Sequence, residues 1–207
     1  MTASMIPVTI LTGFLGAGKT TLLNRILREP HGLRIAIIEN EFGPASIDNQ
    51  LLVTDAAEQI IEMNNGCICC TVRGDLIRIL RKLHLERKTG AIAFDRVAIE
   101  TTGLADPGPV TQSFFTDSFV ARSFLLDGVI TIVDAKHGHE TLDHHLEAQR
   151  QVGFADRILL SKSDLVSTED AASLRSRLIQ INPRATFLIA TWGRFRWLKS
   201  WISAVSI

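Results

Sequence analysis

The stretch "GFLGAGKTT", residues 13–21, decides the fold of this chain. It matches G-x-x-x-x-G-K-[ST] at every fixed position, follows the apolar run "IPVTIL" (6–11) and opens a segment of helical period at 19–28. Backbone N–H groups of such a loop bind phosphate at the N-terminus of the following helix. The pattern predicts a P-loop nucleotide site, and the alternative is a glycine-rich turn that only joins strand to helix.

The P-loop pattern assigns roles to individual residues. We expect Lys19 to be catalytic, because its ammonium reaches the β and γ phosphates, and Thr20 to bind Mg²⁺. The remaining nucleotide-binding positions of the loop are Gly13, Gly16, Ala17, Gly18 and Thr21.

The rest of the chain alternates short β-branched runs with longer segments of helical period, which predicts an α/β fold with a mostly parallel sheet and helices on both faces. The other predicted strands are 34–39, 59–63, 96–100, 128–134, 157–161 and 186–191. The other predicted helices are 73–88, 140–151 and 169–181. Ligands of such sheets bind at the carboxyl ends of the strands.

The segment "RVAIETTGLADPGP" places further catalytic candidates at the end of a strand. Glu100 is positioned to hold magnesium through water or to orient the attacking water, and the Gly103 amide to sense the γ phosphate. Asp106 and the following Pro-Gly-Pro turn are typical of a switch. The alternative for Glu100 is a carboxylate that caps the next helix.

The segment "RILLSKSDL" resembles the N-K-x-D motif that selects guanine nucleotides. The Asp164 carboxylate can accept from both N1–H and the exocyclic amine of guanine, and Lys162 can lay its methylene stem over the base. Ser161 stands where asparagine is usual, which costs about 0.5–1.5 kcal/mol for one lost hydrogen bond. The alternative is a solvated surface turn.

All three cysteines, Cys67, Cys69 and Cys70, lie in "NGCICC", which predicts a metal site. Thiolates at this spacing can hold zinc, with cobalt or nickel accepting the same ligands. A fourth ligand can come from Glu39 or Glu41 in "ENEFG". The alternative is burial of free cysteines as small apolar side chains. A second cluster, His137, His139, His144 and His145, is more typical of solvated residues.

Several motifs taken together resemble the CobW-like metallochaperone GTPases, relatives of the urease and hydrogenase nickel-insertion GTPases, and especially their zinc-handling branch. They are "GFLGAGKTTLLN", "IENEFG", "NGCICC", "IETTGLADP", "VDAKH" and "QVGFADRILLSKSDL". The resemblance covers residues 5–191. It implies low intrinsic GTP hydrolysis, metal at the three cysteines with Glu39 as a participant, and delivery of that metal to a client metalloprotein.

Composition bounds the remaining possibilities. The 22 basic and 22 acidic residues balance, so we expect neither nucleic-acid nor membrane binding. The odd number of cysteines argues against disulfides, and we expect a cytoplasmic protein with reduced thiols. Residues 1–191 are predicted to form the GTPase domain. The tail, 192–207, carries all three tryptophans, which suggests a frameshifted or truncated continuation in place of the family's second domain, and exposed apolar surface then favours a homo-oligomer. An authentic amphipathic tail is the alternative.

The sequence thus predicts a GTPase that couples its nucleotide state to metal transfer. One alternative is a metal-responsive regulatory module that uses GTP as a switch without significant turnover. Another is a nucleoside or cofactor kinase, which would transfer phosphate to a small molecule instead of to water.

Overall fold

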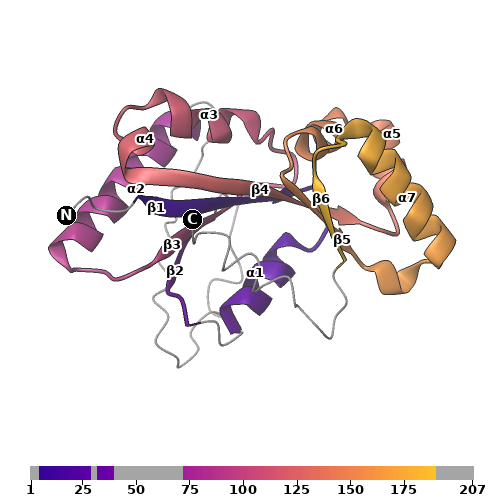
Figure 1. Ribbon diagram of the computed structural model, residues 1–207, viewed down its shortest axis with the longest axis horizontal. Helices are drawn as coiled ribbons and strands as arrows, with labels where there is room; N and C mark the ends of the chain where they lie inside the picture. Colours follow the sequence, from indigo (N-terminus) through magenta and orange to yellow (C-terminus); the bar gives the residue numbers. More distant parts are fainter. Residues whose placement is uncertain (1–4, 29–31, 40–71, 190–207) are drawn as a thin grey trace, which may run out of the picture.

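The computed structural model describes residues 5–28, 32–39 and 72–189, and Figure 1 shows their arrangement. The strands are β1 (Ile6–Gly13), β2 (Ile35–Glu39), β3 (Arg96–Glu100), β4 (Phe124–Asp134), β5 (Arg157–Ser161) and β6 (Thr186–Ile189). The helices are α1 (Lys19–Arg28), α2 (Val72–Thr89), α3 (Gly108–Thr116), α4 (Val120–Ser123), α5 (Gly138–His144), α6 (Leu146–Gly153), the 3₁₀ turn η1 (Ser163–Leu165) and α7 (Thr168–Ile181).

The described strands form one sheet in the order β2-β3-β1-β4-β5-β6, and every neighbouring pair is parallel. The predicted α/β fold with a parallel sheet is therefore confirmed. The connection that follows β1 runs to β2 on one side of it, whereas the connection that follows β4 runs to β5 on the other side, so the adjacent strands β1 and β4 are followed by connections in opposite directions. Such a switch point is where parallel sheets open a crevice for ligands.

Helices cover both faces of the sheet, as the apolar strands require (Figure 1). All five residues of β3 are buried, and β5 divides its side chains between two cores. Leu159 packs into the core beneath α1, whereas Ile158 and Leu160 pack against α5, α6 and α7. The helices α2, α3 and α4 cover β1 and β3 on the other face of the sheet, away from α1 (Figure 1).

The predicted helix 140–151 is wrong as a single element, because the chain breaks it into α5 and α6. His145 has extended backbone (φ −130°, ψ 109°) at the break, and its ring lies 4.4 Å from the ring of Phe14. A continuous helix would place Leu142 and Leu146 on one face, but Leu142 is 1% exposed and Leu146 55% exposed. The break turns α6 so that Ala148, Gln151 and Val152 face the interior.

The other described helices agree closely with prediction. The segment 19–28 is α1 itself, and 73–88 and 169–181 lie within α2 and α7. The two α-helices not predicted, α3 and α4, are short, and α3 is rich in residues of low helix propensity. The predicted strand at 59–63 and the tail at 192–207 lie outside the described residues.

The packing of α7 on the sheet gives a test of the core. Leu174 is fully buried, and its side chain lies against Gly138 of α5. Leu174→Ala should lower the free energy of unfolding by about 2–5 kcal/mol, because the cavity cannot close completely. Urea denaturation measures this change. The control is Ile179→Ala on the same helix, where 38% exposure should limit the loss to about 1 kcal/mol or less. Equal losses would contradict the assigned face of α7.

Candidate functional site

The P-loop turns sharply between β1 and α1, and its glycines allow the turn. Gly16 and Gly18 have φ of 73° and 98°, in the left-handed region that other residues seldom adopt. Gly13 has φ of 146°, and a Cβ there would lie 2.4 Å from the Ile132 carbonyl oxygen of β4. Gly13 is the register partner of Ile132, so β1 and β4 approach closely where the P-loop begins.

The backbone amides of the loop are available to an anion. The N–H groups of Gly16, Gly18, Lys19 and Thr20 donate to no acceptor among the described residues, whereas the Ala17 N–H closes the turn onto Phe14 O at 3.2 Å. These amides lie at the N-terminus of α1, where the helix dipole also favours negative charge. The geometry suits phosphate groups.

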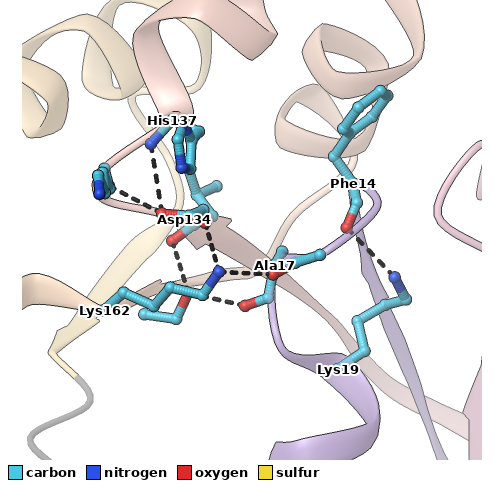
Figure 2. Close-up of polar contacts among 10 residues, drawn as sticks. Phe14, Ala17, Lys19, Asp134, His137 and Lys162 are labelled. Atoms are coloured by element: carbon cyan, nitrogen blue, oxygen red, sulfur yellow. Dashed lines mark hydrogen bonds and ion pairs between the residues drawn. The ribbon is translucent and has the colours of Figure 1, made fainter.

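Lys19 holds the shape of the loop. Its Nζ donates to the carbonyl oxygens of Gly13 (2.8 Å) and Phe14 (3.3 Å), and Figure 2 shows the latter contact. The side chain is 9% exposed, and burial lowers the pKa of Lys19 although the charge of Glu100 opposes the shift. A phosphate oxygen can replace these carbonyl oxygens as acceptor, so the ammonium is placed for the predicted role.

The end of β3 carries a carboxylate directly beside α1. Thr20 Oγ1 donates to Glu100 Oε1 at 2.9 Å, and Glu100 is buried. A hydroxyl and a carboxylate so close together fit Mg²⁺, which prefers oxygen ligands. Glu39, at the end of β2, is the register partner of Glu100, so both carboxylates lie at the same edge of the sheet.

The segment after β3 packs against the P-loop at Gly103. A Cβ on Gly103 would lie 2.7 Å from the Leu15 backbone nitrogen, so only glycine permits this approach. Asp106 accepts from the Gly108 N–H at 2.8 Å and from Arg150 at 3.4 Å. The predicted switch segment is thus in contact with both the P-loop and α6.

The motif after β5 also reaches the P-loop (Figure 2). Ser161 Oγ donates to Ala17 O at 2.7 Å, so the residue that replaces the usual asparagine still fastens β5 to the loop. Lys162 Nζ donates to Gly16 O at 2.9 Å and to Asp134 Oδ2 at 2.7 Å. Asp164 is exposed in η1, with its carboxylate accessible to a ligand.

Asp134 at the end of β4 has a charged carboxylate that accepts several hydrogen bonds. Burial alone would raise the pKa of Asp134, but hydrogen bonds from Lys162 and from the N–H groups of Lys136 and His137 lower it below its ordinary value. The carboxylate therefore fixes Lys162 over the P-loop.

Two hollows flank the loop. One of about 300 Å³ lies between α1 and the ends of β4 and β5, with Thr21, Arg25 and Lys162 among its lining residues. The other, about 200 Å³, lies on the side of α5 and α6, where Phe14, His137 and Gln151 line it. The first connects the phosphate loop to the motif after β5, as a nucleotide requires.

The predicted cysteine site lies outside the described residues, as does Glu41. Its sequence neighbours are described: β2 ends at Glu39, and α2 begins at Val72, two residues after Cys70. Among the residues that the structure describes, no group of three or more His, Cys, Asp or Glu side chains is arranged to hold a metal. The histidines at 137, 139, 144 and 145 are among the described residues and form no such group. None of the described helices is long and apolar enough to cross a membrane.

Sequence reasoning missed two residues that the fold brings to the site. Asp134 ends a strand in "VDAKH", and a strand-end carboxylate was a signal that could have found it. Gln151 contacts the segment after β3 from α6, and nothing in its local sequence indicates this contact.

Residues 7–189 match the family model described as "CobW/HypB/UreG, nucleotide-binding domain". The zinc chaperone YjiA of Escherichia coli is 52% identical over 188 residues, which cover 91% of this chain and 58% of that protein. The zinc-regulated GTPase metalloprotein activator 1 of Schizosaccharomyces pombe is 39% identical over 203 residues, covering 93% and 47%. The chain thus spans less than two thirds of the length of these relatives.

Solved structures agree with these matches. The crystal structure of Zn(II)-bound YjiA GTPase from E. coli has a TM-score of 0.71 at 45% identity and covers 93% of this chain and 59% of that one. The hydrogenase maturation factor HypB of Archaeoglobus fulgidus, at 19% identity and a TM-score of 0.58, shares the fold; the match covers 96% of this chain and 87% of that one.

The Asp134–Lys162 pair gives a test by pH. Because folding lowers the pKa of Asp134, this group stabilises the fold above its ordinary pKa of about 4 and loses that contribution as pH falls through the lower folded value. Asp134→Asn should therefore lower the Tm by a few degrees at pH 7, and the difference from the parent should shrink below pH 4. Thermal unfolding from pH 7 to 3 measures this, with the surface variant Glu140→Gln as control. A difference independent of pH would contradict the assignment.

Proposed function

The chain belongs to the CobW/HypB/UreG family of nucleotide-binding domains, and from this premise we propose that it is a GTP-hydrolysing carrier of zinc. The observation that carries the proposal is the meeting, at one edge of the sheet, of the unpaired loop amides, Lys19, the Thr20–Glu100 pair and the motif at 161–164. The names of the relatives, zinc chaperone and zinc-regulated GTPase metalloprotein activator, favour a carrier over a regulatory module.

The phosphates of the nucleotide bind at the P-loop. The amides of Gly16, Gly18, Lys19 and Thr20 and the α1 dipole hold the α and β phosphates. Gly13, Ala17 and Thr21 shape the loop around them. Lys19 exchanges its loop carbonyl partners for oxygens of the β and γ phosphates. Since burial already disfavours its charge, an anionic partner strengthens the site.

Hydrolysis requires charge stabilisation and an oriented water. Thr20 and Glu100 would hold Mg²⁺, the latter directly or through water, and the ion supplies neutralisation of the β and γ phosphate oxygens. Gly103 would donate its N–H to the γ phosphate. Orienting the attacking water is the alternative role of Glu100. Phosphate passes to water, which separates this reaction from that of a kinase.

Guanine is selected by Asp164. Its exposed carboxylate accepts from N1–H and the exocyclic amine, a donor pair that adenine lacks. Lys162, fixed by Asp134 and Gly16, presents its stem to the base. Ser161 fastens the motif to the P-loop.

Zinc is the cargo, held by Cys67, Cys69 and Cys70 with Glu39 as the fourth ligand. Glu39 pairs in register with Glu100, which contacts Thr20, so a carboxylate of the metal site lies one strand away from the nucleotide site. Cobalt and nickel satisfy the same ligands. The recipient is a client metalloprotein, and a cytoplasmic location keeps the thiols reduced.

The proposed function is tested by measuring zinc affinity in different nucleotide states of the protein. Zinc affinity, measured with a competing chelator, should differ between the free protein and its complexes with GDP and a GTP analogue, by about 1–3 kcal/mol. Lys19→Ala should abolish GTP hydrolysis and remove this difference while zinc binding by the nucleotide-free protein persists. Identical zinc affinity in every nucleotide state would contradict a carrier, and absence of hydrolysis would favour the regulatory module.

Base selection has a separate test. Asp164→Asn should lower GTP affinity by about tenfold or more and shift preference towards xanthosine triphosphate, whose edge offers an acceptor in place of the amine. Competition against a fluorescent nucleotide measures both affinities. Neighbouring Ser163→Ala is a suitable control. If the parent protein bound ATP as well as GTP, the assigned role of Asp164 would be wrong.

A further inference from the structure

The β3–α3 connection, residues 101–107, carries the proposed γ-phosphate contact and is anchored at both ends. At its start, the Thr101 N–H donates to Leu11 O at 2.9 Å and Thr101 Oγ1 to Thr12 Oγ1 at 2.8 Å. At its end, Asp106 accepts from Gly108. Between these anchors, the chain passes the P-loop at Gly103. What fixes this middle part decides where the Gly103 N–H lies.

The middle of the connection is held by one buried side chain from α6. Gln151 is 1% exposed, and its Nε2 donates to Gly103 O at 3.1 Å and to Ala105 O at 3.0 Å. These two acceptors fix the orientation of the amide, because the reverse orientation would oppose Oε1 to two carbonyl oxygens. Both N–H groups of the Gln151 amide thus donate to the β3–α3 connection.

Gln151 is itself rigidly placed. Thr131 Oγ1 of β4 donates to the Gln151 backbone oxygen at 2.7 Å, which fastens α6 to the sheet beside the P-loop. Gln151 lines the hollow of about 200 Å³ together with Phe14 and Leu15, so the side chain lies between the loop and the connection. The preceding Arg150 contacts Asp106 from the exposed side of α6.

The same amide group also has one buried atom without a partner among the described residues. Gln151 Oε1 is buried and accepts no hydrogen bond from any described residue. A buried acceptor without a donor is destabilising, and such groups call for an explanation other than packing. An apolar residue of equal size would fill the space without this defect, but it would release the two carbonyl groups of the connection.

We propose that Gln151 is a positioning residue for recognition of the γ phosphate. By holding the carbonyls of Gly103 and Ala105, it keeps Gly103 against Leu15, where the Gly103 N–H, which donates to no described residue, is available to a terminal phosphate. GDP lacks that phosphate, so Gln151 contributes to the difference in affinity between GTP and GDP. The inference rests on the proposed function, since it concerns the same nucleotide site.

The test compares two nucleotides on one variant. Gln151→Met keeps the length and volume of the side chain but removes both donors. Its affinity for a non-hydrolysable GTP analogue with Mg²⁺ should fall about tenfold, the effect of losing the Gly103 N–H as a donor to a charged phosphate oxygen, while its affinity for GDP stays at the parent value. The matched control is Gln149→Met on the same helix, whose amide donates to Leu142 O and does not reach the connection. It should change neither affinity.

The outcomes separate the inference from the proposed function. Equal losses for both nucleotides, or no loss for either, would overturn the positioning role, since a purely structural residue affects both alike. GDP binding also reports that the variant is folded; if Gln151→Met fails this check, Gln151→Asn, whose amide is one methylene too short to reach, gives the same comparison. If the parent protein itself does not bind the GTP analogue, the proposed function fails and the inference fails with it.

Discussion

The close contact of Gly13 with the backbone of β4 is the constraint on which the site depends. A side chain at this position would meet the Ile132 carbonyl at 2.4 Å, so β1 and β4 could not stay paired with the P-loop folded across them. Because the winding of the sheet reverses between these two strands, the same contact places the loop over the crevice of the fold. Lys19 Nζ donates to the carbonyl oxygen of the same Gly13.

Residues from both halves of the sheet contribute to the nucleotide site around this contact. From the β3 side come Glu100 and the connection that carries Gly103, and from the β5 side come Ser161 and Lys162. Each half touches the P-loop directly, through hydrogen bonds or backbone contact. A nucleotide bound to the loop is therefore in reach of both halves, and a shift of either is transmitted to it.

The sequence was sufficient for the parts of the site that depend on local chemistry. The spacing of glycines and lysine in residues 13–21 predicted the turn between β1 and α1, and helical period predicted α1 at its observed bounds. Contacts between distant segments were not predictable in this way: Gln151 and Gly103 are 48 residues apart, and α6 faces the interior only because the chain breaks at His145. Periodicity describes one element at a time, whereas these positions follow from how three elements meet.

The contacts of Lys19 with the carbonyls of its own loop have a further consequence for the kinetics of ligand capture. The loop already has its turn closed and its cation in place, so binding need not order a flexible segment, and little conformational entropy is lost in the encounter. The barrier lies instead in exchanging one set of oxygen acceptors for another. Differences between ligands should consequently appear mainly in how long each remains bound.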